Sequence, residues 1–312
     1  MTPKIAFITC ISLYATSMLA ENQDAPLYVY TPEEMAAHKD ACRAQILSNP
    51  ANHHDASYQM ARTLRCISGD DADYIPKVAG AGEIFFDEPI PYQRMHNGIK
   101  IILNSYYDCQ WLTDVMHALK GHHEPQEEKC FYEVLKHIPD RATMIELGSY
   151  WGYYSLWFAT TINDAHNYLL EPDLHRLTVG KKNFELNQKT ASFFQAFAGV
   201  LRDREPDATG ASYVAIDDFM HQQNIAHLNI LHADIQGAEV EMLETTISVL
   251  DRIDYFFIST HNTHEECMNF FKKHGLIIVA EHSHTESCSG DGLVVAKRVG
   301  APGPDSIAIR KY

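Results

Sequence analysis

The sequence has no stretch of clustered positive charge. Basic residues occur at most in pairs, such as Lys181-Lys182 and Lys272-Lys273, whereas 41 acidic residues give a formal net charge of −16. Because nucleic acid is a polyanion, this charge balance opposes its binding. The composition therefore predicts that nucleic acid is not a partner.

Cysteines at metal-ligand spacing are also absent. Seven cysteines are spread along the chain without a close pair, and the 18 histidines show no spacing typical of a zinc site. The sequence therefore predicts no bound metal. Loss of a cleaved segment that contains Cys10 would leave six cysteines, a number that permits disulfides but does not require them.

A long apolar run is missing as well. The run over 5–20 has 16 residues, whereas a membrane-spanning helix needs about 20. This run follows Lys4 and precedes the polar segment ENQD, which is the form of a secretory signal peptide. A membrane anchor and a buried N-terminal segment are the alternatives. The sequence predicts no stable membrane span.

Helical signals dominate residues 31–65. Thr31 is a favourable N-cap, Pro32 suits the first helical position, and acidic residues follow in the first turn. A proline-containing break at 48–54 separates this helix from a second one. The pattern resembles a single tetratricopeptide-type unit, so we predict a helical accessory region over 21–75 whose helix pair offers a surface to a protein partner.

A connector with short strands and a helix is expected over 76–125, and a further helix follows it. Pro125 and acidic residues stand in the first turn of that helix, where acids complement the helix dipole. On this interpretation the acidic residues stabilise the start of the helix and do not belong to a binding site. The alternative is that the helix covers a binding site, which His123, Glu124 and Glu127 would then face.

From residue 143 the pattern alternates between strand and helix, which predicts a parallel sheet covered on both faces. The predicted strands are 143–147, 166–171, 191–200, 228–234, 254–260, 276–282 and 292–298. Helices are predicted between them at 153–162, 174–187, 217–224, 239–250 and 265–274.

The last two predicted strands have no helix between them, so we expect an antiparallel hairpin at the edge of the sheet. The expected fold is α/β: a Rossmann-like, seven-stranded and mostly parallel sheet that ends in this hairpin. The corresponding domain is predicted over 126–300, with a C-terminal tail over 301–312.

The first of these strands contains Glu146 and leads into a turn bracketed by Gly148 and Gly152. In an open α/β sheet the ligand lies at the carboxyl ends of the strands, where glycines let it approach the backbone. The second strand ends in Glu171-Pro172, where a carboxylate can accept two hydrogen bonds from a ribose diol. This arrangement suits a nucleoside.

Two nucleoside cofactors compete for this turn. NAD needs G-x-G-x-x-G, so that its pyrophosphate can touch the backbone. Here the turn reads Gly-Ser-Tyr-Trp-Gly, with an acidic residue two positions before the first glycine. An acid suits a cationic sulfonium and repels a pyrophosphate, so the turn favours S-adenosylmethionine over NAD.

Four segments strengthen this interpretation: ELGSYWGYYS, LLEPDLHRLTVGKKNFELN, IDDF and LHADIQGAEVEML. Together they resemble the FkbM-type methyltransferases, a family of class I enzymes that use S-adenosylmethionine. The run at 234–239 resembles the family motif Asp-Val-Glu-Gly-Ala-Glu, with Gln236 in place of its first glutamate. The resemblance spans about 143–300. It implies cofactor contacts from Glu146, Gly148, Ser149 and Gly152 at the methionine end, from Glu171 at the ribose, and from Asp234.

Methyl transfer to a hydroxyl requires a positioned acceptor and removal of its proton. Asp234 and His261 stand at the ends of the fourth and fifth predicted strands, and either could act as the base. We favour His261, because an imidazole takes up a proton near pH 7; Asp234 would position the acceptor or orient the imidazole. A magnesium ion held by these two residues and Asn262 is disfavoured, because magnesium prefers oxygen ligands.

The predicted function is therefore S-adenosylmethionine-dependent methyl transfer, and the family resemblance implies O-methylation of a small-molecule or sugar hydroxyl. The alternatives are a catalytically inactive protein that keeps the fold for binding, and an NAD-dependent oxidoreductase. The location stays open. A signal peptide predicts a secreted, periplasmic or lumenal protein, whereas S-adenosylmethionine is made in the cytosol.

Overall fold

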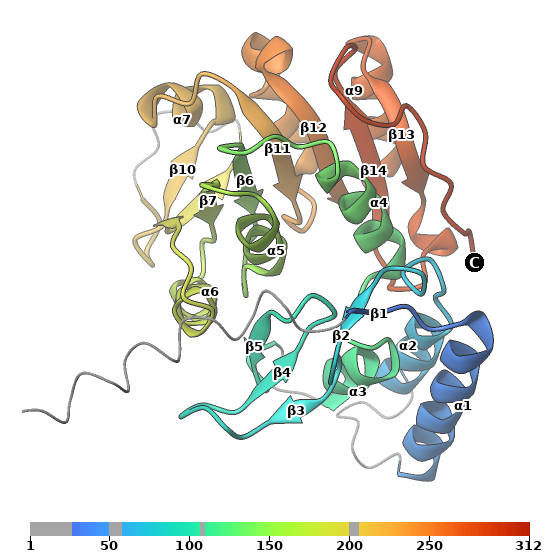
Figure 1. The fold of residues 1–312 in the computed structure, drawn as a ribbon. Coiled ribbons are helices and arrows are strands. Elements are labelled where there is room, and N and C mark those ends of the chain that lie inside the picture. The colour runs from blue at the N-terminus through green and yellow to red at the C-terminus, as the bar shows by residue number, and fades with distance from the viewer. Residues whose placement is uncertain (1–26, 50–57, 107–109, 200–205) are drawn as a thin grey trace, which may run out of the picture.

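The computed structural model describes residues 27–49, 58–106, 110–199 and 206–312 (Figure 1). The apolar run over 5–20, and with it the predicted signal peptide, lies outside the described residues, as do Cys10 and Cys109. None of the helices in the described ranges combines the length and the apolar character needed to cross a bilayer.

A seven-stranded sheet forms the centre of the molecule, in the order β13-β14-β12-β11-β6-β7-β8. Its strands are β6 (Thr143–Leu147), β7 (His166–Leu170), β8 (Ser192–Phe194), β11 (Leu228–Ala233), β12 (Ile253–Thr260), β13 (Ile277–His282) and β14 (Gly292–Lys297). Neighbours from β8 to β12 pair in parallel, whereas β14 pairs antiparallel with both β12 and β13. The predicted Rossmann-like sheet and its antiparallel C-terminal hairpin are confirmed.

Helices cover both faces of this sheet because its strands are apolar on both sides. In β11, Ile230 packs into one core and Leu231 into the other, since successive side chains of a strand point to opposite faces. The helices that follow the strands are α5 (Tyr153–Thr161), α6 (Leu174–Leu186), α7 (Ile216–Gln222), α8 (Glu239–Glu244) and α9 (His264–Lys273).

The helix predicted over 239–250 is shorter than expected. It ends as α8 at Glu244 and is followed by a separate 3-10 turn, η2 (Ile247–Arg252). The hydroxyls of Thr245 and Thr246 donate to the carbonyls of Met242 and Leu243, at 2.6 and 2.7 Å. Such local bonds compete with the helical ladder and account for the interruption.

The strand predicted over 191–200 is divided at Gln195. Its first part is β8, and its second part is β9 (Ala196–Ala198), which pairs in parallel with β10 (Ser212–Val214), a strand that the sequence pattern did not predict. The Gln195 amide donates to the Pro172 and Thr209 carbonyls. This anchored side chain fixes the point at which the chain leaves the central sheet.

The N-terminal helix pair is present as α1 (Pro32–Ser48) and α2 (Tyr58–Ile67). Thr31 and Glu34 form a reciprocal capping box at the start of α1. Both helices pack on α3 (Gln110–Ala118) around a small core of Cys42, Ile46, Met60, Ile67 and Ala118. A helix of the predicted connector thus closes the core that two helices alone could not bury.

The connector also forms short strands, and it is tied to the central domain. A pair is made by β1 (Leu27–Tyr28) with β2 (Lys77–Val78), and an antiparallel sheet by β3 (Ile84–Phe85), β4 (Tyr92–Arg94) and β5 (Lys100–Ile102). The Asn187 and Asn183 side chains at the end of α6 accept from the backbone N–H groups of Lys100 and Ile102.

Helix α4 (Pro125–Leu135) joins the N-terminal elements to the central sheet, as Figure 1 shows. The Gln126 amide donates to the carbonyls of Glu286 and Arg310, and the Arg310 N–H donates to Asp71. The segment 301–312 is therefore packed against α4 and the N-terminal region. This packing sets the N-terminus of α4 over the carboxyl end of the sheet.

We expect Gly148→Ala to destabilise the fold strongly. Gly148 has φ +68°, and a Cβ atom there would lie 1.8 Å from the Asp234 carbonyl oxygen. Gly275→Ala is the matched control, because Gly275 has φ +72° with no atom within 4 Å of a Cβ. Urea unfolding should show a loss of about 1 kcal/mol for the control and at least about 2 kcal/mol more for Gly148→Ala. Equal losses would contradict the close approach.

Candidate active site

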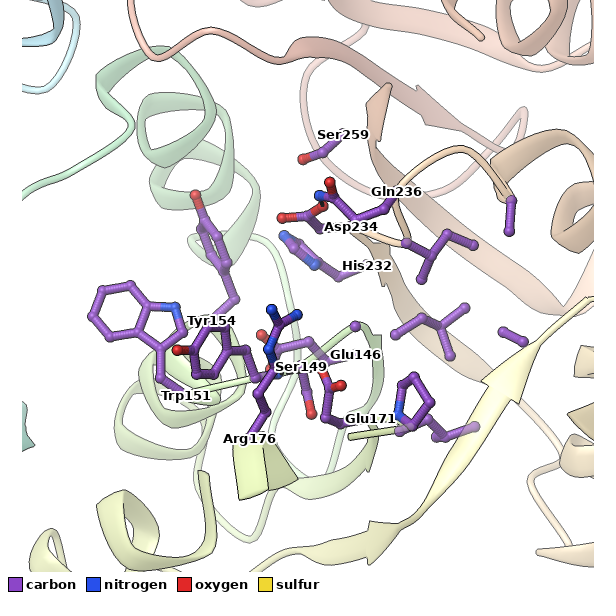
Figure 2. A pocket seen from close by; sticks show the side chains of 18 of the residues that line it. Glu146, Ser149, Trp151, Tyr154, Glu171, Arg176, His232, Asp234, Gln236 and Ser259 are labelled. Atoms are coloured by element: carbon purple, nitrogen blue, oxygen red, sulfur yellow. Dashed lines mark hydrogen bonds between the residues drawn. The ribbon is translucent and has the colours of Figure 1, made fainter. Parts of the chain in front are cut away.

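A cavity of about 440 Å³ opens at the carboxyl ends of β6, β7 and β11. Figure 2 shows Glu171, Ser149 and Arg176 at one end of it, and Asp234, Gln236 and Ser259 at the other. Of the residues that the sequence predicted for the site, the cavity is lined by Glu146, Gly148, Ser149, Glu171 and Asp234. Gly152 and His261 lie outside its lining.

The turn after β6 brings backbone into the cavity. The N–H groups of Gly148 and Ser149 both donate to the Leu170 carbonyl at the end of β7, at 2.9 and 3.1 Å. Gly152, at φ +70°, is the N-cap of α5 and has no room for a side chain against Leu169 and Phe184. The turn therefore needs its glycines for packing.

Ser149 presents a buried hydroxyl to the cavity. Its side chain is 2% exposed, and its Oγ has no hydrogen-bond partner within the described residues. A buried hydroxyl without a partner costs free energy. A polar ligand in the cavity would supply that partner.

Two buried carboxylates flank the turn. The Ser155 N–H donates to Glu146 Oε2 at 2.9 Å, so Glu146 caps the first turn of α5 while it lines the cavity. Glu171 accepts from the N–H groups of Tyr150 and Asp173, at 3.2 and 2.9 Å. Burial raises the pKa of both carboxyls, and these backbone hydrogen bonds counteract the rise. Each carboxylate keeps lone pairs that can face a ligand.

An apolar wall lies beside Glu171. It is formed by Leu170, Pro172, Ala196, Phe197, Ala198 and Ile235. The cavity is also lined by an aromatic and cationic group, in which the ring centres of Tyr106 and Tyr150 stack 4.9 Å apart and the Arg176 guanidinium lies 4.8 Å from the Tyr150 ring centre. A flat aromatic base next to a ribose would fit between such surfaces.

Asp234 and His261 form one hydrogen-bonded group with Gln236 and Glu239. The Gln236 amide donates to Asp234 Oδ1 at 2.8 Å, and His261 Nε2 lies 3.4 Å from the same oxygen. His261 Nδ1 lies 2.9 Å from Glu239 Oε1. Glu239 is fully buried and also accepts from the Gly237 N–H and the Thr263 hydroxyl, so it ties the start of α8 to the segment that follows β12.

The protonation of this pair differs from the expectation that His261 is a free base. Burial lowers the pKa of His261, but the hydrogen bond to Glu239 and the nearby carboxylates of Asp234 and Asp291 outweigh it and raise the pKa to about 9. Burial raises the pKa of Asp234 to about 7 although His261 opposes the rise. The imidazole is therefore the more basic of the two groups, and Asp234 is the group whose pKa lies close to 7.

The segment at the N-terminus of α4 contributes polar residues that the sequence analysis gave only as an alternative. His123 and Glu124 line the cavity, and Glu124 accepts from the Tyr154 hydroxyl at 3.1 Å. His123 lies between two carboxylates: its Nε2 is 3.3 Å from Glu124 Oε2, and its Nδ1 is 2.6 Å from Glu128 Oε1. Although burial lowers the pKa of His123, these two carboxylates raise it to about 10.

His232 was not predicted as a site residue, because it stands inside the predicted strand 228–234. It lines the cavity, and its Nε2 lies 2.8 Å from Glu127 Oε1, while the Ser259 hydroxyl donates to Glu127 Oε2 at 3.1 Å. Its Nδ1 has no hydrogen-bond partner among the described residues. The acids in the first turn of α4 are thus buried partners of histidines and are not exposed to solvent. The sequence signal for His232 was its position as a polar residue inside the apolar run LNILHA.

The sequence matches no protein-family model and no curated protein. Among solved structures, TrmK of M. capricolum, in complex with S-adenosylhomocysteine, is 14% identical over 58% of this chain and 71% of its own, with a TM-score of 0.40. A Streptococcus pneumoniae protein assigned as a tRNA methyltransferase is 14% identical over 54% and 69%, with a TM-score of 0.38. A Clostridium thermocellum protein assigned as an rRNA methylase is 9% identical over 57% and 97%, with a TM-score of 0.41.

The fold is that of a class I methyltransferase. Numbered along the chain, the strands of the central sheet have the order 3-2-1-4-5-7-6, with the seventh strand antiparallel to its neighbours. Membership of the FkbM family is not confirmed, because no family model matches.

The predicted exclusion of nucleic acid as a partner does not hold. Solved structures that resemble this fold include proteins assigned to tRNA and rRNA methylation. Net charge describes the whole surface, whereas an acceptor is recognised at one face. The charge of −16 therefore does not exclude a nucleic acid acceptor.

We expect the His261 ion pair to stabilise the fold in a pH-dependent way. The folded pKa of about 9 lies above the ordinary value of 6.5, so the stabilisation is complete below pH 6.5 and is lost as the pH rises through 9. The difference in unfolding free energy between the unmodified protein and His261→Gln should shrink by up to about 3 kcal/mol across this range. Glu239→Gln, which removes the partner, should remove most of this dependence. A difference that does not change with pH would contradict the ion pair.

Proposed function

We propose that the protein is an S-adenosylmethionine-dependent methyltransferase that methylates a hydroxyl group. One observation carries this proposal: three carboxylates, Glu146, Glu171 and Asp234, stand at the ends of three adjacent parallel strands around one cavity. In an open α/β sheet this is the ligand position. The partnerless Ser149 hydroxyl beside them supports a polar ligand there.

The residues around the cavity fit the parts of this cofactor. Glu171 would accept hydrogen bonds from the ribose hydroxyls, and the apolar wall with Phe197 would hold the adenine. Glu146 and Ser149 would face the amino-acid end. The carboxylates of the lining suit the positive sulfonium, because opposite charges attract in a partly dry site.

The bound cofactor would supply a methyl group activated by positive sulfur. Asp234 would take the proton of the acceptor hydroxyl, because its carboxyl lines the cavity and its pKa of about 7 is matched to that task. The protonated His261, held by Glu239, would orient the Asp234 carboxylate. This exchanges the two roles favoured from the sequence.

The acceptor we propose is a hydroxyl of a small molecule or sugar, since the cavity is also lined by polar groups, beyond those assigned to the cofactor, that can bind hydroxyls. These are His123, Glu124, Tyr154, His232 and Ser259. An NAD-dependent oxidoreductase is less well supported, because Ser149-Tyr150-Trp151 stands where a pyrophosphate needs glycine.

We expect S-adenosylhomocysteine to bind the purified protein with micromolar affinity, and NAD not to bind. Glu171→Gln should raise the dissociation constant at least tenfold, about 1.4 kcal/mol, because it removes the charged acceptor at the ribose. Glu185→Gln, at an exposed position of the following helix α6, should leave the dissociation constant unchanged. Calorimetric titration measures all of these; a folded protein that binds neither ligand would favour the inactive binding protein.

We expect Asp234→Asn to lower the methyl-transfer rate at least about 100-fold, the usual contribution of a general base. An acceptor would first be sought among hydroxyl compounds, sugars and RNA. The rate should rise with pH through about 7, as Asp234 ionises, and fall above about 9, as His261 loses its proton. Asp251→Asn, at an exposed acid of η2, is the control. A full rate in Asp234→Asn would rule Asp234 out as the base.

A further inference from the structure

Three metal-ligating side chains meet far from the cavity, where α1 packs on α3. His38 and Cys42 lie one turn apart on the same face of α1, and His117 lies near the end of α3. One ligand atom from each residue lies within 4.8 Å of the others. Because the spacing of four residues brings two side chains of a helix together, the fold needs only to supply the third ligand.

The distances fit a tetrahedral zinc ion. With Zn–S of about 2.3 Å and Zn–N of about 2.05 Å, the edge between a thiolate and an imidazole ligand is about 3.6 Å. Cys42 Sγ lies 3.6 Å from His38 Nε2. Two of the ligand atoms therefore already stand at the separation that the ion requires.

Glu83, just before β3, lies next to His117 and is the candidate for a fourth ligand. Its Oε1 lies 3.7 Å from His117 Nδ1, close to the edge of about 3.4 Å between nitrogen and oxygen ligands of zinc. The Glu83 side chain is 47% exposed, so it can adjust to an ion at small cost. The set of one thiolate, two imidazoles and one carboxylate is typical of zinc.

The chemistry of the cluster suits a cation. His38 Nε2 at present lies 3.1 Å from the His117 carbonyl oxygen, and ligation would exchange that contact for the ion. Cys42 is buried at 5% exposure, which shields a zinc–sulfur bond from water.

We propose that His38, Cys42, His117 and Glu83 bind one Zn²⁺ ion that ties α1 to α3 and to the start of β3. The helix pair buries only a small apolar core against α3, and small cores commonly rely on a metal or a disulfide for stability. The ion fastens the N-terminal helices to the rest of the protein. The site is independent of the cofactor cavity and of the proposed methyl transfer.

The test uses the full-length chain without a histidine tag, reduced and stripped of metal with a chelator, and then titrated with Zn²⁺ against a chromophoric competitor. We expect one equivalent per chain and a rise in melting temperature on binding. Cys42→Ser and His117→Ala should each weaken binding at least tenfold, whereas His221→Ala, at an exposed histidine of α7, should not.

Cobalt identifies the ligands by a second route. Co²⁺ in this site should give visible bands of tetrahedral geometry and a near-ultraviolet thiolate band, and Cys42→Ser should abolish the thiolate band. Circular dichroism of Cys42→Ser and His117→Ala shows whether each variant is folded. Weaker binding by a folded variant then reports a lost ligand and not a lost fold. No stoichiometric Zn²⁺ binding, or binding that both folded variants retain at full strength, would overturn the proposal.

Discussion

The close approach of two backbone segments at the centre of the sheet is the constraint on which the site depends. A Cβ at Gly148 would lie 1.8 Å from the Asp234 carbonyl oxygen, and the Asp234 N–H donates to the Leu147 carbonyl at 3.0 Å. The turn after β6 is therefore held against the end of β11. Because the Gly148 N–H also donates to Leu170, the end of β7 joins the same group.

This contact brings three acids to one cavity, and their charges have to be compensated. Glu146, Glu171 and Asp234 come from the ends of three parallel strands, and Glu124, the N-cap of α4, adds a fourth carboxylate. Histidines supply the compensation: His123 and His232 are buried beside acids that raise their pKa values against the effect of burial. The cavity thus holds both signs of charge at low exposure, a pattern typical of functional sites.

The sheet and the acidic residues could be predicted from the sequence because both depend on local pattern. Apolar strands alternate with helices, and a carboxylate at the end of a strand lies at the ligand edge of the sheet whatever surrounds it. The break at Thr245 and Thr246 could not be predicted, because it depends on hydroxyl bonds that compete with the helix. The position of α4 was equally hidden, since tertiary packing decides which helix covers the sheet.

Contacts between distant parts of the chain account for most of what the sequence did not show. Glu127 meets His232 and Ser259 across 105 and 132 residues, and His117 meets His38 across 79. A single sequence contains no signal for such pairs. The roles of Asp234 and His261 also depended on tertiary structure, because their protonation is set by neighbours and not by residue type.

The most direct test of the central claim is a crystal structure of the protein grown with S-adenosylhomocysteine. We expect the ribose hydroxyls on Glu171, the amino-acid end beside Glu146 and Ser149, and the sulfur facing Asp234. A ligand bound elsewhere, or an empty cavity at saturating S-adenosylhomocysteine, would contradict the proposed cofactor site.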